Sequence, residues 1–378
     1  MTPSPENIPE RAGEELSSPL RIAPDRFVLE ADAIASIDRY LDTMDISSVY
    51  VLGGERAYDA VRDELEASLE RTGIDARYAA FAGECSPSAV FDHREQIERL
   101  DPDALIGVGG GKALDTAKLA AEGRCPVVAV PTSPATCAAW TALSIVYESD
   151  GTYRGGVSLS RCPELVVGDL GVLTDAPARL LANGVMDASA KHFETRLISE
   201  AERPTNRWGI RLAEEAYLDE LREYAGQAYE DVQADAMTPA VENVVEAVIA
   251  GPGLAAGLLS DRSYLGLAHV FCYSLLEYGS VRSQSYHGER VAYGVVLLRT
   301  LSNDDASPEP SELLDWYERL GAELTLQGLG VDPDEEIIND IAQDVVDGLE
   351  HAVLTVPASR SDVSTAIRRI ERMAATDR

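Results

Sequence analysis

The sequence predicts a parallel-sheet α/β domain followed by an all-helical domain. Between residue 21 and about residue 176, short apolar runs alternate with amphipathic segments, a pattern typical of strands joined by crossover helices. From about residue 177 onward almost every segment has helical spacing. A length of 378 residues also favours two domains over one.

The elements of the first domain follow one another in a regular order. Residues 1–20 are polar, contain several prolines and are expected to form a flexible arm. The predicted strands are residues 47–54, 74–83, 104–111 and 126–132, and the predicted helices are residues 55–73, 88–101 and 112–123. Because strand, helix and strand succeed one another, the sheet is expected to be parallel.

A hairpin and a domain boundary complete this organisation. Residues 140–160 hold two β-rich runs around Ser-Asp-Gly, which predicts a β-hairpin. We expect a nucleotide-binding domain at 21–176, a helical domain at 177–378 and a cleft between them. The apolar segment 244–259 is interrupted by Gly-Pro-Gly, so it is expected to be broken there and too short to span a bilayer.

Charge and composition exclude several classes of partner. The formal net charge of −33 opposes binding to nucleic acid, which requires a basic face. In roughly 1 M salt such self-repulsion is largely screened, so a halophilic host is expected. No signal-like N-terminus is present, and the five scattered cysteines include no C-x-x-C pair. We therefore expect a cytoplasmic protein with reduced thiols that binds no membrane.

The stretch "IGVGGGKALDTAK", residues 106–118, is typical of a phosphate-binding turn. Gly109, Gly110 and Gly111 follow a predicted strand and open a predicted helix. Without side chains, the backbone at a helix N-terminus can lie close to a pyrophosphate. The alternative interpretation is that these glycines allow tight packing of the helix against the sheet. The spacing is not that of the Rossmann fingerprint. Lys112 either adds a cation or begins the helix in solvent, and Asp115 either reaches a ribose hydroxyl or caps loop amides.

Hydroxyl side chains follow the next predicted strand. Thr132, Ser133 and Thr136 stand at its carboxyl end, in "VPTSPAT". In a parallel sheet these side chains would lie beside the same crevice as the glycines. The sequence therefore predicts a nucleotide phosphate site at this edge.

A metal site is one interpretation of three residues in the helical half. His269 and His287 flank a helical region, and Asp187 stands among small apolar residues at an expected helix start. A buried carboxylate needs a partner, so Asp187 is either an N-terminal cap or a ligand of a cation. One aspartate and two histidines leave open positions on a divalent ion, as a catalytic zinc requires.

Taken together, four motifs resemble the glycerol-dehydrogenase-like branch of the metal-dependent, iron-containing type alcohol dehydrogenases. They are "GVGGGKALDTAK", "VPTSPATCAAWTALSIVY", "GVMDASAKHFE" and "AHVFCYSL" with "YHGERVAYG". The resemblance covers residues 22 to about 355 and implies a dehydroquinate synthase-like architecture. A nucleotide-binding α/β domain then precedes a helical domain that binds metal and substrate.

The resemblance also implies roles for individual residues. The metal ligands carry over as Asp187, His269 and His287, with zinc favoured over iron because Lys191 replaces a further histidine. His192 would point about 100° away around the helix. Lys191 and Cys137 are expected beside the reaction centre, with Cys137 and Trp140 shaping the pocket. The residues implied in binding NAD(H) or NADP(H) are Gly54, Gly109, Gly110, Gly111, Lys112, Asp115, Thr132, Thr136, Thr141, Leu143 and Tyr147.

Two departures from the family pattern bear on specificity. Cys137 stands where glycerol dehydrogenases have an aspartate, so we expect a 2-hydroxy acid/2-oxo acid pair, with Lys191 able to pair with the substrate carboxylate. Arg262 could do the same, but we favour its interpretation as a surface helix residue. Glycerol is the alternative substrate. Gly54 stands where NAD-preferring relatives have an acid, and Arg56 follows it closely, which favours NADP(H).

Proteins of other activities remain as alternatives. A dehydroquinate synthase-like lyase and a glycerol-1-phosphate dehydrogenase would both need phosphate-binding cations, which the helical half offers sparingly. A catalytically silent relative need not hold a metal. By analogy with the family, a homo-oligomer, either a dimer or an octamer, is expected.

Overall fold

The computed structural model of the protein describes residues 21–196, 207–259, 265–302, 308–350, 352 and 356–376. The expected arm at residues 1–20 and Arg262 lie outside the described residues. The chain divides into two compact units, Met1–Pro177 with Ile249–Ser263, and Ala178–Val248 with Tyr264–Arg378. The sequence-based division placed residues 249–263 in the helical half, whereas in the structure they group with the first unit.

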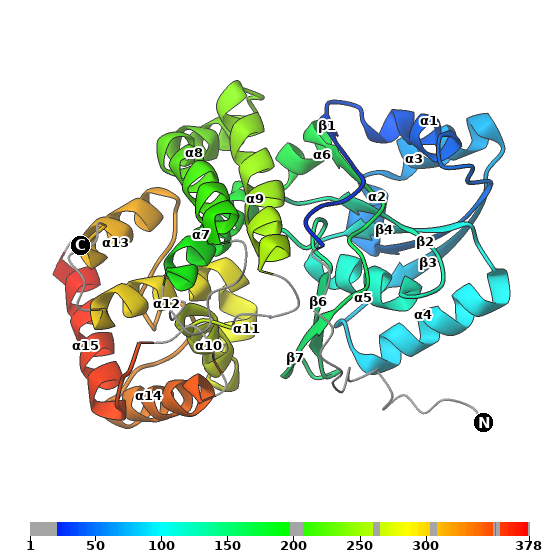
Figure 1. Ribbon diagram of the computed structural model, residues 1–378. Helices are drawn as coiled ribbons and strands as arrows, with labels where there is room; N and C mark the ends of the chain where they lie inside the picture. The colour runs from blue at the N-terminus through cyan, green and yellow to red at the C-terminus, as the bar shows by residue number, and fades with distance from the viewer. Residues whose placement is uncertain are drawn as a thin grey trace, which may run out of the picture. The chain divides into compact units, whose positions relative to one another are not determined.

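A six-stranded parallel sheet forms the centre of the first unit, as predicted (Figure 1). The strand order is β1-β8-β5-β4-β2-β3. The strands are β1 (Arg26–Glu30), β2 (Ser48–Gly54), β3 (Asp75–Phe81), β4 (Ala104–Gly109), β5 (Val127–Pro131) and β8 (Leu165–Asp169). A separate antiparallel hairpin joins β6 (Leu143–Tyr147) to β7 (Tyr153–Ser158), which confirms the predicted ribbon.

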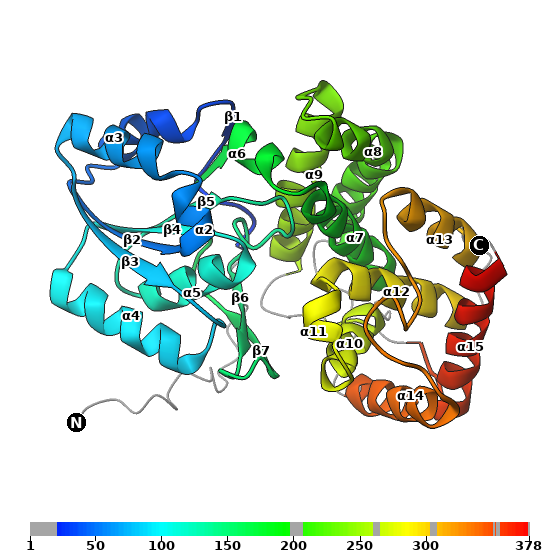
Figure 2. The ribbon, with the colours of Figure 1, turned by 180° about the vertical axis from the view of Figure 1, so that it is seen from behind.

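Helices cover both faces of the sheet. Alternate residues of β2 face opposite layers: Val49 and Val51 pack in one apolar cluster, and Tyr50 and Leu52 in another. The first layer is formed by α1 (Ile37–Asp42) and α3 (Arg62–Thr72), the second by α4 (Pro87–Leu100) and α5 (Gly111–Ala121), as Figures 1 and 2 show from opposite sides. Because both faces are covered, the central strands are apolar along their whole length.

One predicted helix is divided in two. Residues 55–73 form α2 (Glu55–Asp59) and α3, with a break at Ala60 and Val61. Val61 is fully buried and has a non-helical backbone, with φ −122° and ψ −3°. Gly73, the last residue of the predicted helix, ends α3 in the left-handed conformation with φ +74°.

The second unit is helical throughout its described residues. Helix α12 lies at its centre, and Gly288 to Arg299 are all buried. It packs against α7, α10, α13 and α15. The helices from here to the end of the chain are α7 (Ala178–Thr195), α8 (Arg207–Gln233), α9 (Pro239–Leu258), α10 (Leu267–Ser274), α11 (Val281–Gln284), α12 (His287–Leu301), α13 (Pro310–Arg319), α14 (Glu335–Leu349) and α15 (Arg360–Thr376).

Helix α9 corrects the expectation of a break at Gly-Pro-Gly. It continues through Pro252 to Leu258. Gly251, which precedes the proline, has no side chain to clash with the proline ring. Gly253 leaves space for the ring of Trp140, since a Cβ on Gly253 would lie 2.6 Å from Trp140 Cγ. Among the described residues α9 alone is long and apolar enough to cross a membrane, and half of that stretch is buried in the protein. A buried core helix passes the same test, so this is weak evidence for a membrane span.

Candidate metal centre and nucleotide-binding loop

The glycine turn follows the carboxyl end of β4 and begins α5. Gly109 has φ +146°, and a Cβ there would lie 2.9 Å from the Cβ of Ala113. Gly110 is the N-cap of α5, and Gly111 is its first residue. Only glycine fits at Gly109. Gly110 and Gly111 have no side chains, so nothing at these positions covers the backbone amides at the start of the helix. This cradle fits a phosphate of a dinucleotide.

The predicted hydroxyl side chains lie beside this turn. Strands β4 and β5 pair in parallel with Gly109 opposite Pro131, and the Thr132 amide donates to the Gly109 carbonyl oxygen at 3.2 Å. A Cβ on Gly111 would lie 3.5 Å from Thr136 Oγ1, and one on Gly110 would lie 3.6 Å from Ser133 Oγ. The structure therefore brings both predicted segments to one sheet edge.

The two lysines of this motif are in different environments. Lys112 is half-exposed, and its Nζ lies 2.6 Å from Glu84 Oε1. Lys118 is buried, and its Nζ donates to the carbonyl oxygens of Ala138 at 2.8 Å and Thr141 at 3.2 Å, and also to that of Leu143. Lys118 thus supports the backbone between the hydroxyl segment and the hairpin.

Asp115 supports the same backbone. Its Oδ2 accepts from the Ile145 amide at 3.0 Å, so the carboxylate binds an amide of strand β6 and not of a loop. Its Oδ1 lies 2.9 Å from Lys118 Nζ, in an ion pair without hydrogen-bond geometry, and has no other partner. Burial raises the pKa of Asp115, and Lys118 opposes that shift.

The remaining cofactor candidates are spread along the first unit. Gly54 ends β2 and is the N-cap of α2, and Arg56 is exposed in the first turn of that helix. Leu143 begins the hairpin, and the amide of Tyr147 donates to the Cys85 carbonyl oxygen at 2.9 Å. Cys137 is half-buried, and its carbonyl oxygen accepts from the Trp140 amide.

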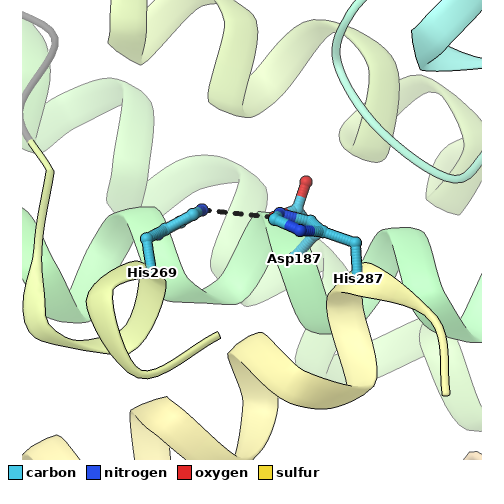
Figure 3. A group of neighbouring side chains, drawn as sticks. All are labelled: Asp187, His269 and His287. Carbon is cyan, nitrogen blue, oxygen red and sulfur yellow. Dashed lines mark ion pairs between the residues drawn. The ribbon is translucent and has the colours of Figure 1, made fainter. Parts of the chain in front are cut away.

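Three helices of the second unit each contribute one side chain to a cluster that could hold a metal ion. Asp187 lies on α7, His269 on α10 and His287 at the first position of α12, and their side chains point toward one another (Figure 3). Asp187 is in the middle of α7, which corrects the expected helix start and excludes the N-cap interpretation. Among the described residues this is the one such group of three.

Glycines let these helices approach closely. A Cβ on Gly288 would lie 2.0 Å from the Asn183 carbonyl oxygen, between α12 and α7. A Cβ on Gly294 would lie 2.5 Å from the Ala268 carbonyl oxygen, between α12 and α10. Asn183 Oδ1 also accepts from the Gly288 amide, which fixes the start of α12 beside α7. The sequence analysis assigned no role to these glycines.

The geometry of the cluster fits a divalent ion. Asp187 Oδ1 lies 3.2 Å from His287 Nε2 and 3.5 Å from His269 Nε2, and the three ligand atoms lie within 4.8 Å of one another. Ligands about 2.0–2.1 Å from a tetrahedral zinc are separated by about 3.3 Å. Two imidazole nitrogens and one carboxylate oxygen form a donor set suited to zinc or iron.

Glu194 is a candidate site residue that sequence reasoning missed. Its Oε2 lies 2.9 Å from His269 Nδ1, its Oε1 accepts from the His269 amide, and its side chain is fully buried. A carboxylate on the outer nitrogen of a ligating imidazole fixes the orientation of the ring. Glu194 follows Asp187 by seven residues on α7, so helical periodicity would place both on one face.

The two residues beside the cluster on α7 differ in their surroundings. Lys191 is half-buried. Its charge helps to lower the pKa of Glu194, and it opposes the burial that raises the pKa of Glu214 to about 8. His192 is buried, its Nε2 lies 3.2 Å from Arg196 Nη1, and burial with the Arg196 charge lowers its pKa to about 4. His192 is outside the cluster, as expected.

The imidazoles of the cluster are held in their charged form. Burial opposes protonation, but Glu194 and Asp187 raise the pKa of His269 to about 9. Cys272 and Asp187 likewise outweigh burial and raise the pKa of His287 to about 10. The two histidines in turn hold the pKa of Asp187 well below its usual range, against the effect of burial.

Binding of a divalent ion is expected to release about two protons at pH 7, because an ion must displace them from imidazoles whose pKa values are about 9 and about 10. Zn²⁺ affinity should therefore rise with pH up to that range. The stability of the ion-free fold has the opposite pH dependence. Because folding raises both histidine pKa values, the protonated imidazoles stabilise the fold fully below about pH 6.5, and this contribution is lost as the pH rises through 9 to 10. Calorimetry in buffers of different ionisation enthalpy measures the proton count, and zero release at pH 7 would contradict the expectation.

Comparisons with known proteins agree with this geometry. The family model described as iron-containing alcohol dehydrogenase matches residues 24–170. The glycerol dehydrogenase of Pseudomonas putida is 33% identical over 321 residues, which cover 82% of this chain and 85% of that protein. The chain belongs to the iron-containing alcohol dehydrogenase family.

Other members of this alcohol dehydrogenase family are similarly close. Hydroxycarboxylate dehydrogenase A of Escherichia coli is 31% identical over 321 residues, covering 83% of this chain and 87% of that protein. The crystal structure of a probable glycerol dehydrogenase from Sinorhizobium meliloti has a TM-score of 0.83 at 28% identity, and covers 94% of this chain and 98% of its own. The resemblance and the fold class inferred from the sequence are confirmed, and the chain is an oxidoreductase of a metal-dependent, NAD(P)-linked alcohol dehydrogenase family.

Glycerol is better supported as a substrate than the 2-hydroxy acid that the sequence analysis preferred. Both the Pseudomonas and the Sinorhizobium proteins bear the name of glycerol dehydrogenase, and one of the relatives above bears that of a hydroxycarboxylate dehydrogenase. The preference had depended on Cys137 and Lys191.

Proposed function

We propose that this protein is an NAD(P)-linked dehydrogenase of glycerol or a related small polyol, with one zinc ion held by Asp187, His269 and His287. The observation that carries the proposal is the convergence of these three side chains from three helices onto one point. The cofactor is assigned to the glycine turn at Gly109 to Gly111. A homo-oligomer remains the expected assembly.

Different residues would bind the ion, orient its ligands and support the backbone near the cofactor. Asp187, His269 and His287 would hold the ion, and Glu194 would orient His269 through its Nδ1. A bound divalent ion supplies Lewis acidity, which favours the ionised form of an alcohol, and the nicotinamide accepts hydride. Asp115 and Lys118 would fix the backbone that leads into the hairpin, where Thr141 and Leu143 are expected to contact the cofactor.

The charge around Lys191 supports an uncharged substrate. Lys191 lies within electrostatic reach of two buried carboxyl groups, those of Glu194 and Glu214. Of the two, Glu194 is the ionised one, since burial raises the pKa of Glu214 to about 8. A substrate carboxylate would have to compete with Glu194 for the ammonium group. A polyol is uncharged, so it needs no cationic group to bind it.

A 2-oxo acid is the second candidate substrate. It is favoured by Cys137 in the position where the family's glycerol dehydrogenases have an aspartate, and by the hydroxycarboxylate dehydrogenase among the relatives. A spectrophotometric screen of polyols, aldehydes and 2-oxo acids, at high salt and with both nicotinamide cofactors, separates the two. Turnover of 2-oxo acids without any of glycerol would overturn the proposal.

NADP(H) is the expected cofactor, because Gly54 leaves room and exposed Arg56 offers charge for a 2′-phosphate. Arg56→Ala should raise the KM for NADP(H) about tenfold and leave that for NAD(H) nearly unchanged. Gly54→Asp should reverse the preference. Steady-state kinetics with both cofactors measures this, and equal effects of Arg56→Ala on both would contradict it.

Stability should rise with salt, since a net charge of −33 repels itself in dilute buffer. The screening length falls to roughly 3 Å at 1 M ionic strength. Thermal unfolding followed by circular dichroism should show Tm increasing from 0.1 to about 1 M KCl and changing less beyond. A Tm independent of salt over that range would argue against adaptation to a halophilic cytoplasm.

A further inference from the structure

The two histidines of the cluster have different partners at their outer nitrogens. His269 Nδ1 lies 2.9 Å from the fully buried carboxylate of Glu194. His287 Nδ1 instead lies 3.4 Å from Sγ of Cys272. One imidazole is therefore supported by a carboxylate and the other by a sulfur atom.

The sulfur of Cys272 is held in place by its surroundings. Cys272 follows His269 by three residues on α10, and its side chain is fully buried. The sulfur also lies 3.8 Å from the His287 carbonyl oxygen, in the first turn of α12. It thus connects α10 to the start of α12.

The packing of α10 against α12 leaves this sulfur little freedom. Phe271 stacks on Tyr293 with ring centroids 4.8 Å apart, and Gly294 lies against the backbone of Ala268. Both contacts join the same two helices, through residues one and four positions before Cys272 on α10. Interiors packed at this density resist the displacement of a single side chain.

We propose that Cys272 is a positioning residue of the metal centre, whose sulfur accepts a hydrogen bond from His287 Nδ1 and keeps Nε2 directed at the ion. The inference rests on the proposed metal function. A neutral imidazole that donates from Nδ1 presents the lone pair of Nε2, which is the form that ligates a metal. Sulfur is a weaker acceptor than a carboxylate, so His287 is the less firmly held of the two imidazole ligands.

The test compares Cys272→Ala with Cys125→Ala in the full-length protein. Cys125 is also buried and belongs to the other compact unit, so its replacement removes a thiol without touching the cluster. Zn²⁺ affinity is measured by competition with a chromophoric chelator. Cys272→Ala should weaken Zn²⁺ binding about 10- to 100-fold, the usual effect of losing an outer partner, and Cys125→Ala should not change it.

A second readout distinguishes positioning from general loosening. The chain has five histidines, so the ¹⁵N spectrum of histidine-labelled, zinc-loaded protein is simple to assign. Cys272→Ala should move the Nδ1 resonance of His287 and leave that of His269 in place. Cys272→Ser retains a hydrogen-bond acceptor for His287 Nδ1 and should restore part of the Zn²⁺ affinity. If the alanine variant fails to fold, the serine variant is measured in its place.

The outcomes separate this inference from the function on which it rests. Wild-type Zn²⁺ affinity in Cys272→Ala, with an unchanged His287 Nδ1 resonance, overturns the positioning role. Shifts of equal size at His269 and His287 also overturn it, since they indicate a loosened fold. If the wild-type protein itself binds no Zn²⁺, the proposed metal function fails, and the inference fails with it.

Discussion

Asp187→Asn is expected to lower kcat/KM by at least about a thousandfold and to leave the purified protein without its metal. The asparagine keeps the volume of the side chain but removes the anion that lies 3.2 Å and 3.5 Å from the two imidazoles. Loss of Lewis-acid stabilisation is worth several kcal/mol, and a thousandfold corresponds to about 4 kcal/mol. Steady-state kinetics and elemental analysis of the same preparation measure both effects.

Asp315→Asn is the matched control for this experiment. Asp315 is exposed on α13 in the same compact unit, so the same chemical change there should leave activity and metal content within about twofold of wild type. If Asp187→Asn retains both metal and activity, the three-residue metal centre is wrong.

Lys118→Met is expected to destabilise the fold by about 3–5 kcal/mol and to weaken binding of the nicotinamide cofactor. The change leaves Asp115 buried without its counter-charge and removes the donor to the carbonyl oxygens of Ala138, Thr141 and Leu143. Breaking a buried ion pair from one side has this cost. Denaturant unfolding gives the free energy, and fluorescence titration with NADPH gives the affinity.

Lys112→Met in the same helix is the control. Lys112 pairs with Glu84 but is half-exposed, so its loss should cost less than about 1 kcal/mol. Equal destabilisation by the two substitutions would show that burial of Lys118 is not what stabilises this backbone.

The strand and helix pattern of the first unit was largely predictable, because each element carries its own signal. Strands β2, β4 and β5 are short apolar runs, and Gly73 ends a helix at the last residue of the predicted range. The break at Val61 was missed because the helical pattern continues across it in the sequence, while burial of Val61 against the sheet decides the backbone there. Pro252 was misjudged because Gly251 before it has no side chain to clash with the proline ring.

The candidate site was predicted unevenly. Asp187, His269 and His287 were candidate metal ligands from the sequence and were assigned that role by the family resemblance, whereas Glu194 and Cys272 were missed. Both carry a periodic signal, since Glu194 follows Asp187 by seven residues and Cys272 follows His269 by three. Glu194 was overlooked because a lone acid in a helix is usually solvated, and only the structure shows its burial against His269.

The amino-acid sequence by itself determined the local chemistry of this protein: where strands and helices form, where glycine is required, and which side chains can ligate a metal. These properties depend on neighbours along the chain, within one or two helical turns. The tertiary structure alone decided that α7, α10 and α12 cross closely enough to join one carboxylate and two imidazoles. It also decided which of two lysines in one motif is buried, because burial depends on packing between segments that are distant in sequence.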